Sequence, residues 1–432
     1  MSEQKIPQGY KQTEVGVIPE DWECKTIKDI TLDMLQGVNT AIDIPEYVSD
    51  GIPMLKANNV IDQILSLESV DFVSEKTYLK YAERYQIKKG DFLFSNIGAR
   101  LGTGSIFKYQ FSCTFAWNVM KIVPNNKKVT PEFLAYMINF PSQSEKIKSE
   151  QSGSGMGFIP KSVMQNVIIP IPKNIKEQSL IAITLSHVDD LISELEKLIA
   201  KKQAIKTATM QQLLTGKTRL PQFALREDGT RKGYKQSELG AIPEDWEVVE
   251  LGAIAKINMG QSPSSSNYND KGLGLPLVQG NADILNRKTI VRNYTFQITK
   301  IAQRGDLILS VRAPVGEVAK AMFDCCIGRG VCSIRYKNDY LYHWLVNFEK
   351  EWNTFSKGST FDSINSNELK EIKLLLPLND EQITIATILS DMDSEIQALE
   401  QRLNKTHQIK QGMMQELLTG KTRLVQPEAR GV

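Results

Sequence analysis

Two stretches of the chain carry apolar residues at alternating spacings of four and three, the pattern of a helix that packs along one face. The first stretch places them at Ile181, Leu185, Val188, Ile192, Leu195 and Ile199. The second keeps the same register at Ile385, Leu389, Met392, Ile396, Leu399 and Leu403. The pattern predicts two helices of about 38 residues, roughly 57 Å long, that pack on each other through these positions. They are antiparallel if the chain returns to its first half.

The ends of both predicted helices carry suitable residues. Glu177 and Glu381 fall in the first turns, where a carboxylate favours the helix dipole, and Gly216 and Gly420 are typical C-terminal residues. The ladders weaken at Lys206 and Lys410 and then resume. That interruption fits either a solvated stretch or one that meets a partner, and we favour the solvated stretch.

The regions that precede the helices mix the two kinds of periodicity. Residues 119–124 predict a strand that ends at a proline, and residues 131–138 predict a helix with Thr130 as its N-cap and Pro131 in its first position. Residues 340–346 predict the counterpart of that helix in the second half. We therefore expect two α/β (α+β) globular domains, separated by the two long helices.

The sequence contains an internal repeat. Residues 9–23 return in similar form at 233–247, and residues 213–220 return letter for letter at 417–424. The offsets differ (233 − 9 = 224 and 417 − 213 = 204), so the regions between the repeated ends differ in length. We expect an internal duplication with pseudo-two-fold symmetry, in which the two halves share a scaffold but differ in the sequence of their middle regions. The expected segments are a globular domain at 1–175, a helix at 176–216, a globular domain at 217–379, a helix at 380–424 and a tail at 425–432.

Composition places the chain among soluble proteins. Hydrophobic residues make up 41% and charged residues 24% of the 432 residues, and the chain shows neither a long apolar span nor a signal peptide. We expect a cytoplasmic protein without a membrane segment. The net charge is only +2. A protein that grips DNA alone is usually more basic, so a DNA-binding role would need a partner that supplies phosphate contacts.

Motifs for catalysis are missing. The Thr-Gly-Lys-Thr segments at 215–218 and 419–422 resemble part of a phosphate loop, but glutamines stand where its first glycine belongs, and each segment ends a helix instead of beginning one. No Asn-Pro-Pro-Tyr or Asp-Pro-Pro-Tyr, GxSxG or HExxH motif occurs. Cys325, Cys326 and Cys332 lack metal-ligand spacing and are expected to be buried thiols. We expect no catalytic residue, metal or cofactor in this chain.

Polar, glycine-containing loops are the candidates for DNA binding. Small residues let the backbone approach a phosphate, and an arginine just after a strand can grip guanine through two hydrogen bonds. The alternative is a set of ordinary turns with surface arginines. The candidate DNA-binding residues are Asn96, Arg100, Ser152, Gly153, Ser154, Lys161, Arg312, Lys357, Gly358 and Ser359.

Taken in order, these segments resemble the specificity subunit family of type I restriction–modification enzymes. The resemblance covers the whole chain. It rests on the Gly-Asp-hydrophobic-Ser stretches at 90–95 and 305–310, on the proline-ended strand, and on the Glu-Gln-x-x-Ile-x-x-x-Leu segments at 177–185 and 381–389. Each segment alone is weak, but their order, repeated twice with heptads between, is specific.

The resemblance implies a non-catalytic subunit that binds double-stranded DNA. Each domain would read one half of a split, asymmetric site, and the helices would set the spacing and dock two modification (methyltransferase) subunits. S-adenosylmethionine is expected on those partners, and a restriction–translocation subunit would join them. Two other hypotheses stay open: a coiled-coil scaffold that joins partner proteins, and a DNA-processing enzyme with the Gly-Lys-Thr segments as its centre.

Overall fold

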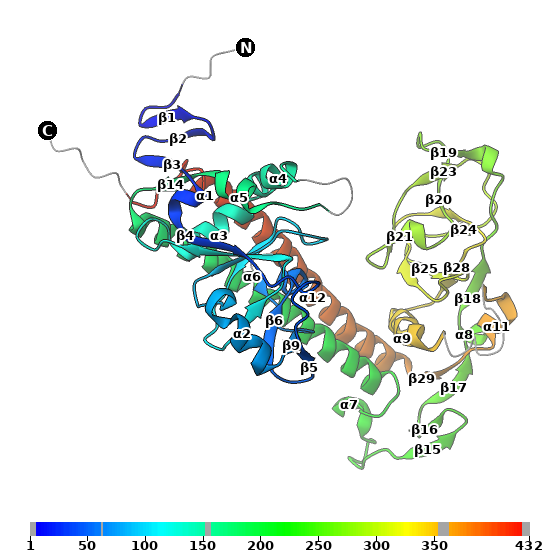
Figure 1. The fold of residues 1–432 in the computed structure, drawn as a ribbon. Helices are drawn as coiled ribbons and strands as arrows, with labels where there is room; N and C mark the ends of the chain where they lie inside the picture. Colours follow the sequence, from blue (N-terminus) through cyan, green and yellow to red (C-terminus); the bar gives the residue numbers. More distant parts are fainter. Residues whose placement is uncertain (1–5, 62–63, 152–156, 353–362, 426–432) are drawn as a thin grey trace. The chain divides into compact units, whose positions relative to one another are not determined.

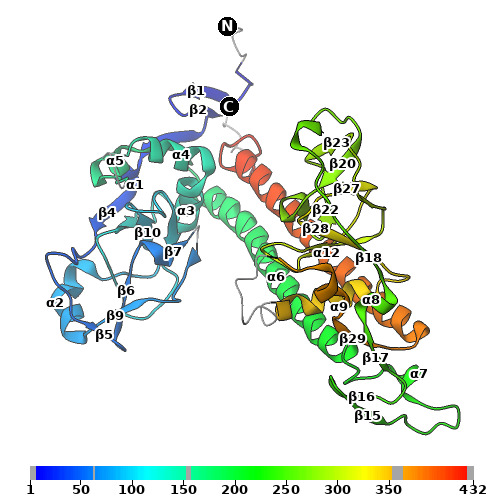
Figure 2. The same cartoon turned by 90° about the vertical axis from the view of Figure 1, so that its right-hand side faces the viewer.

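The computed structural model describes residues 6–61, 64–151, 157–352 and 363–425, which form two compact units. The first unit contains residues 1–194 and 402–432, and the second contains residues 195–401. Two long helices, α6 (Ile175–Leu213) and α12 (Asn379–Leu417), each contribute to both units (Figures 1 and 2). The expected starts of these helices, 176 and 380, differ from the observed starts by one residue, whereas the expected ends, 216 and 424, lie three and seven residues beyond the observed ends.

In the first unit, short strands and helices precede α6 in the chain. Its elements, in chain order, are β1 (Tyr10–Thr13), β2 (Gly16–Pro19), β3 (Trp22–Thr26), α1 (Ile27–Ile30), β4 (Thr31–Gln36), β5 (Tyr47–Val48), β6 (Ile52–Leu55), η1 (Ala57–Asn59), β7 (Val60–Ile61), β8 (Ile64–Leu65), β9 (Asp71–Val73), α2 (Glu75–Tyr85), β10 (Phe92–Ser95), β11 (Gly104–Ile106), β12 (Thr114–Phe115), β13 (Val119–Pro124), α3 (Pro131–Asn139), α4 (Pro141–Ser149), α5 (Lys161–Asn166) and β14 (Ile168–Pro172).

Two four-stranded sheets carry the first unit, in the orders β11-β10-β13-β4 and β12-β6-β9-β5. The strand predicted at 119–124 is β13, and the predicted helix is α3, whose N-cap Thr130 accepts a hydrogen bond from the backbone of Phe133. The main core joins α3 and β13 to Ile181 and Leu185 of α6 and to Leu417 of α12. These ladder positions therefore pack into the globular core as well as along the helix pair.

The second unit repeats this plan with different lengths. Its elements are α7 (Pro221–Ala224), β15 (Tyr234–Ser237), β16 (Gly240–Pro243), β17 (Glu247–Glu250), α8 (Leu251–Ile254), β18 (Lys256–Met259), η2 (Ser265–Asn267), β19 (Tyr268–Asn269), β20 (Leu275–Val278), η3 (Asn281–Asp283), β21 (Ile284–Leu285), β22 (Lys288–Thr289), β23 (Asn293–Thr295), β24 (Ile301–Ala302), β25 (Leu307–Ser310), β26 (Val318–Lys320), β27 (Cys325–Ile327), β28 (Val331–Arg335), α9 (Tyr340–Phe348), η4 (Glu349–Glu351), α11 (Ser366–Lys370) and β29 (Lys373–Leu376).

Larger sheets carry the second unit, in the orders β18-β28-β25-β26-β22-β21 and β19-β23-β20-β27-β24. Helix α9 confirms the helix expected at 340–346. One core packs Ile385 and Leu389 of α12 with Leu213 of α6 and with the fully buried Trp246. The second unit therefore rests on the start of α12 in the way that the first unit rests on the start of α6.

The repeated sequence ends fold into one device, which we call the arginine clasp. In the first unit, Arg423, just beyond α12, donates to Glu177 at the start of α6 (2.5 and 2.8 Å) and to Asp21 (2.9 and 2.7 Å). Its guanidinium also lies 6.0 Å from the ring centroid of the buried Trp22. The clasp holds the end of one long helix to the start of the other, which makes them antiparallel in this unit.

The second unit has the same clasp. Arg219, just beyond α6, donates to Glu381 (2.7 and 2.8 Å) and to Asp245 (2.8 and 3.2 Å), and Trp246 also donates to Glu381 (3.0 Å). The Gly-Lys-Thr segment therefore lies between the end of α6 and the clasp arginine, at the C-terminal cap of the helix.

The glycines of the Gly-Lys-Thr segments confirm this capping role. Gly216 and Gly420 adopt φ of +69° and +71°, the left-handed conformation of a helix C-terminus. A Cβ at Gly216 would stand 2.7 Å from Pro243, and the Gly420 carbonyl accepts a hydrogen bond from Tyr10 (3.0 Å). A backbone packed this closely, at the negative end of a helix, is a poor place for a nucleotide phosphate.

The lysines that interrupt the ladders form ion pairs between the helices. Lys410 pairs with Asp189 in the first unit (2.5 Å), and Lys206 pairs with Asp393 in the second. The lysine side chains are only 19% and 15% exposed. The interpretation of these segments as solvated is therefore wrong. The apolar ladder could not reveal the pairing, because it does not show which residue of the other helix each lysine faces.

Candidate nucleic-acid interface

In the first unit, the loop that follows β10 is held tightly at its base. Ser95, the last residue of β10, donates its backbone N–H to Thr103 (2.8 Å), and Gly102 donates to Ser95 (2.9 Å). The loop between them contains Arg100, which is exposed. The result is a short loop projecting from a fixed strand end, at the place where the sequence predicted a binding loop.

The second unit builds the loop after β25 with matching bonds. Ser310 donates to Glu317 (2.9 Å) and Gly316 donates to Ser310 (2.9 Å). The Ser310 hydroxyl adds a bond to the Pro314 carbonyl (2.9 Å). The loop is one residue shorter than in the first unit, and it presents the exposed side chain of Arg312.

A second turn packs beside each of these loops. In the first unit, the turn between β12 and β13 contains Trp117 and Asn118, and the Asn118 carbonyl accepts the N–H of Asn96 (3.4 Å). In the second unit, the turn between β27 and β28 contains Arg329 and Gly330, and the Gly330 carbonyl accepts the N–H of Val311 (2.9 Å).

The chain that follows each predicted glycine–serine loop joins the same group. The N–H of Ile159 donates to Asn96 (3.0 Å), and that of Ile364 donates to Val311 (2.9 Å). Isolated bridges pair Ile97 with Phe158 and Arg312 with Ser363. The segments that follow the predicted glycine–serine loops therefore pair with the strand-end loops within each unit. We call these groups the loop clusters: residues 96–103, 116–118 and 157–159 in the first unit, and 311–317, 328–330 and 363–364 in the second.

The structure places the predicted DNA-binding residues in different environments. Arg100, Lys161 and Arg312 are exposed, and Lys161 begins α5. Asn96 is fully buried, and its side-chain nitrogen lies 3.5 Å from the Ile159 carbonyl, so in this conformation it supports the loop and does not face a ligand. The remaining predicted residues lie outside the described residues: Ser152, Gly153, Ser154, Lys357, Gly358 and Ser359.

The hydrogen bonds also show which positions of the two loops correspond. Asn96 and Val311 occupy the same place in their networks, so the next residues, Ile97 and Arg312, are equivalent. Arg100 lies three residues beyond Ile97, so Arg100 and Arg312 are not at equivalent positions. The sequence had put the two arginines at similar points because each follows a strand that ends in serine.

Sequence reasoning missed two exposed residues of the loop clusters. Trp117 is 42% exposed, although tryptophan usually buries its ring, and Arg329 is exposed between two buried glycines. A large aromatic residue or an arginine in a short turn between two strands was the available signal, but both turns lacked the glycine–serine pattern that drew attention elsewhere.

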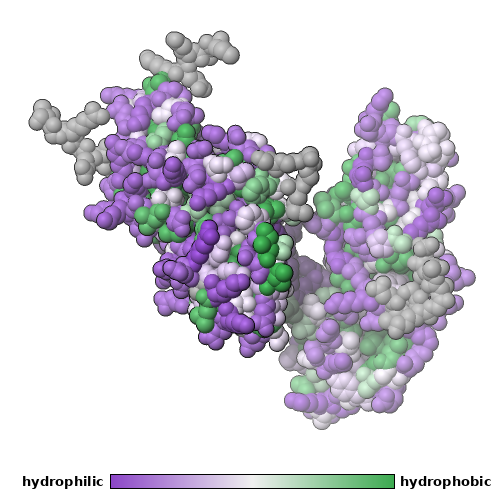
Figure 3. Space-filling model, viewed as in Figure 1, coloured by the Kyte–Doolittle hydropathy of each residue, from purple (hydrophilic) through white to green (hydrophobic). Residues whose placement is uncertain are grey.

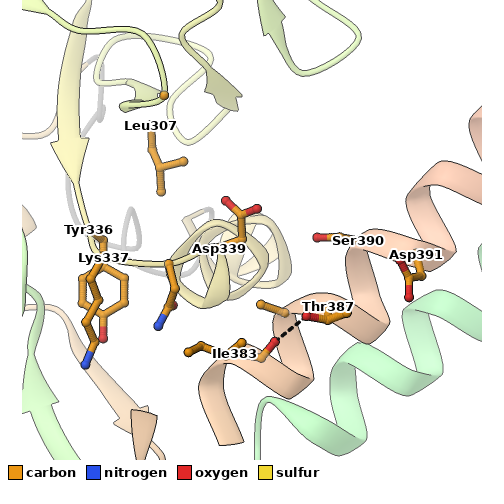
Figure 4. A pocket seen from close by; sticks show the side chains of 11 residues that line it. Leu307, Tyr336, Lys337, Asp339, Ile383, Thr387, Ser390 and Asp391 are labelled. Atoms are coloured by element: carbon orange, nitrogen blue, oxygen red, sulfur yellow. Dashed lines mark hydrogen bonds between the residues drawn. The ribbon is translucent and has the colours of Figure 1, made fainter. Parts of the chain in front are cut away.

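A pocket of about 480 Å³ in the second unit lies between the turn before α9 and the start of α12 (Figure 4). Ser390, on its wall, is hydrogen-bonded to His343 Nε2 (2.9 Å), and Asp393 stands 4.0 Å from Nδ1. Asp393 is engaged by Lys206, and burial, the main cause, lowers the pKa of His343 to about 4. This group therefore links α9 to both long helices. Because Asp393 is distant from His343 and already paired with Lys206, it is poorly placed to orient His343 as a catalytic base.

The described part of the chain offers no metal site built from three or more His, Cys, Asp or Glu side chains. Cys325, Cys326 and Cys332 are free and buried in β27 and β28, and burial raises the pKa of Cys325 and Cys332 to about 12. None of the described helices has both the length and the apolarity that crossing a bilayer requires. Hydrophilic residues cover much of the visible surface of each unit (Figure 3).

Comparison with known proteins gives a consistent result over both halves. The family model described as "Type I restriction modification DNA specificity domain" matches residues 19–207 and 243–410. A protein described as the specificity subunit of the type I restriction enzyme MjaX of Methanocaldococcus jannaschii is 32% identical over 428 residues, which cover 96% of this chain and 97% of that relative. The MjaVIII specificity subunit of the same organism is 24% identical over 437 residues, or 96% of each chain.

Solved structures share the fold. A chain from a study of complex assembly and conformational transition of the type I R-M system is 22% identical, with a TM-score of 0.60 over 94% of this chain and 99% of that one. The S subunit of the type I restriction–modification system of M. genitalium is 15% identical, with a TM-score of 0.59 over 92% of this chain and 96% of that one. The matched halves, the long helices and the near full-length relatives lead to one conclusion: this chain belongs to the type I restriction–modification DNA specificity subunit family.

Proposed function

We propose that this chain is the non-catalytic, DNA-reading subunit of a type I restriction–modification complex. Each globular domain reads one half of a split, asymmetric site on double-stranded DNA. The observation that carries the proposal is the loop cluster, which recurs in both units on matching backbone bonds but presents different side chains. Two DNA-reading domains with different target sequences are expected to share their backbone structure and to differ in the side chains that they present.

The two long helices connect these readers and offer the docking faces for partners. Because each unit has an arginine clasp and a lysine–aspartate pair between the helices, two copies of one partner could bind in equivalent ways. We propose two modification (methyltransferase) subunits in this role, with S-adenosylmethionine bound on them and a restriction–translocation subunit joining the assembly. The net charge of +2 supports a division of labour in which these partners supply part of the phosphate grip.

The proposal assigns no reaction to this chain. The Gly-Lys-Thr segments cap helices, and the Ser390–His343 pair lacks an orienting carboxylate within hydrogen-bond distance. We therefore expect no methyltransferase, nuclease or ATPase activity from the purified chain alone.

The experiment compares the full chain alone, the modification partner alone and the two together. Adenine methylation of the host genome, mapped at single-base resolution, should require both proteins and should reveal one bipartite motif. Methyl transfer by the rigorously purified chain would contradict the proposal. Assembly with the partner without any sequence-specific methylation or DNA binding would favour the alternative of a protein scaffold.

A further inference from the structure

The turn between β12 and β13 in the first unit and the turn between β27 and β28 in the second have the same backbone frame. The N–H groups of Ala116 and Gly328 donate to the strands beside them, to Leu55 and Val278 respectively (both 2.8 Å). Within each turn, Val119 donates back to Ala116 (2.9 Å) and Val331 to Gly328 (3.1 Å).

Two further bonds fix each turn from its other side. Gly37 and Val38 donate to Val119 and Phe115 (3.1 and 2.9 Å) in the first unit. In the second unit, the matching donors are Gly260 and Gln261, and their acceptors are Val331 and Ile327 (3.0 and 2.9 Å). Together with the bond from the neighbouring loop, these backbone bonds match in the two units, so Trp117 and Arg329 occupy equivalent positions.

Both side chains project from a backbone that is already fixed. The Trp117 N–H donates to Val38 (2.8 Å), and its carbonyl accepts the side-chain amide of Gln36 (2.5 Å). The Arg329 N–H donates to the Ser262 hydroxyl (3.0 Å). In the described part of the chain, no ion pair is found for the Arg329 guanidinium. Because the backbone of each turn is already fixed, binding through these side chains has little backbone entropy to lose, and the ordering cost is confined to the side chain itself.

A second pair of equivalent positions, next to these turns, also has an apolar residue in the first unit and an arginine in the second. One bond in each unit, from Asn96 to Asn118 and from Val311 to Gly330, links the turn to the strand-end loop. It places Ile97 beside the turn of Trp117, and Arg312 beside the turn of Arg329. The first unit therefore presents an apolar pair at these two positions, and the second presents a pair of arginines.

We infer that Trp117 and Arg329 are specificity-determining residues at one equivalent reading position of the two domains. This inference rests on the proposed function. Arg329 reads a guanine through its two major-groove acceptors, O6 and N7, for which the planar guanidinium fork is suited. Trp117 makes an apolar contact with a thymine methyl group, so that the first domain requires an A·T pair at the corresponding position.

Methylation mapping of the assembled enzyme tests which half-site each residue reads. Arg329→Ala should relax the motif at a single G·C pair in one half, and Trp117→Ala should relax it at a single A·T pair in the other half. Arg304→Ala and Phe111→Ala are the matched controls, because these exposed residues lie at the opposite ends of the strands from the loop clusters. The controls should leave the motif intact. An unchanged motif in either test variant, or relaxation of the same half by both, overturns the inference.

Binding to modified duplexes tests the chemistry. Replacing the guanine by 7-deazaguanine, or the thymine by uracil, should weaken the parent complex and leave the corresponding alanine variant unaffected. Arg329→Ala should lower discrimination between cognate and substituted sites by about 5- to 150-fold. Arg329→Lys keeps the charge but not the fork, so it should lose discrimination too. If Arg329→Lys retains full discrimination, or if Arg329→Ala weakens binding equally on all sequences with a salt slope smaller by about one, Arg329 contacts phosphate and the inference fails.

The two levels of the hypothesis fail in different ways. If the parent chain and its partner methylate and bind no specific DNA, the proposed function itself is wrong. If the parent reads a bipartite motif that the variants leave unchanged, only the inference is wrong. Trp117→Phe and Arg329→Lys guard against loss of folding, and partner assembly and the thermal unfolding midpoint of each variant are measured beside the parent.

Discussion

A single arginine in each unit determines how the repeated sequence ends fit together. Arg219 and Arg423 each bind two carboxylates and lie near a buried tryptophan ring, in clasps formed from segments 162 and 246 residues apart. The carboxylates at the helix starts, Glu381 and Glu177, are nearly inaccessible to solvent. A buried carboxylate is costly without its partner, so the clasps hold more than a surface ion pair does.

The first prediction concerns the stability of the second clasp. Arg219→Ala leaves Glu381 buried and unpaired, and should lower the free energy of unfolding by about 3 kcal/mol. Arg226→Ala is the matched control, because Arg226 also makes a two-pronged pair, but with Glu244 at an exposed site. Its loss should cost less than about 1 kcal/mol. Urea unfolding of the full chain, followed by tryptophan fluorescence, measures both. Equal losses would show that burial does not strengthen the clasp.

The clasps also predict how stability depends on pH. Burial by itself would raise the pKa of Asp245, but hydrogen bonds and charges from Arg219 and Lys232 outweigh it and hold the pKa below its usual 3.8. A carboxylate with a lowered folded pKa stabilises the fold above its unfolded pKa, and the contribution fades as the pH falls through the folded value. Unfolding free energy between pH 6 and about pH 2 should fall more steeply for the parent than for Asp245→Asn. Parallel curves would contradict this prediction.

The exposed arginines of the strand-end loops give a prediction about ligand contacts. We expect Arg100, in the longer, glycine-containing loop, to contact phosphate, and Arg312, beside Pro314, to contact a base. Arg100→Ala should then weaken binding on all sequences and reduce the salt slope by about one. Arg312→Ala should cost about 1–3 kcal/mol on the cognate site and relax one position. To distinguish the two kinds of contact, we measure the affinity of the assembled complex for cognate and scrambled duplexes at several salt concentrations. Parent-like binding by both variants would make them surface residues.

At this scale the sequence revealed which residues recur, but not what they touch. Glu177 and Gly216 were correctly placed at helix ends, since capping depends on neighbours along the chain. The partners of Arg219 and Lys206 lie on the other helix, and no local pattern indicates them. Ile97 and Arg312 could not be matched either, because the loops differ by one residue and only the backbone bonds show which positions correspond.

At the scale of elements, the helices were the most predictable part of the chain. An apolar ladder that keeps its register over many turns leaves few alternatives, and the observed helices Ile175–Leu213 and Asn379–Leu417 each have 39 residues. The small strands were less predictable, because several have only two or three residues and depend on partners far along the chain. The predicted strand at 119–124 was an exception because it is long, apolar and ends at a proline.

The helices lead to a prediction about spacing. If they act as a ruler between the two half-sites, inserting four residues near Ser193 should lengthen the DNA spacer. Four helical residues add about 6 Å, or roughly two base pairs. Because α12 runs antiparallel to α6 within each unit, a matched insertion in α12 must be made opposite Ser193, near Thr406, to keep the interhelical pairs in register. Methylation mapping of the assembled variant gives the spacer directly. An active variant with an unchanged motif would contradict a ruler.

At the scale of the whole chain, the fold makes each recognition domain an insertion whose two ends meet. In the first unit, β3 pairs with β14, and Trp22 lies opposite Pro172. In the second, β17 pairs with β29, and Glu247 lies opposite Leu376. A domain whose ends are adjacent can be exchanged with little effect on its base, provided that the base is kept. The clasp and the long helices lie outside the exchanged region in both units.

This architecture predicts that the two specificities are separable. Replacing residues 24–172 by the equivalent region of a relative should change one half of the methylated motif and leave the other half unchanged. The reason is that the exchanged region contains the whole loop cluster of the first unit, while Asp21, Glu177 and Arg423 of its clasp remain. The reciprocal exchange in the second unit, between β17 and β29, should change only the other half. Methylome sequencing of both chimaeras measures the outcome, with the parent chain as control. If one exchange altered both halves, the loop clusters would not read independently, and specificity would have to depend on contacts shared by the two units.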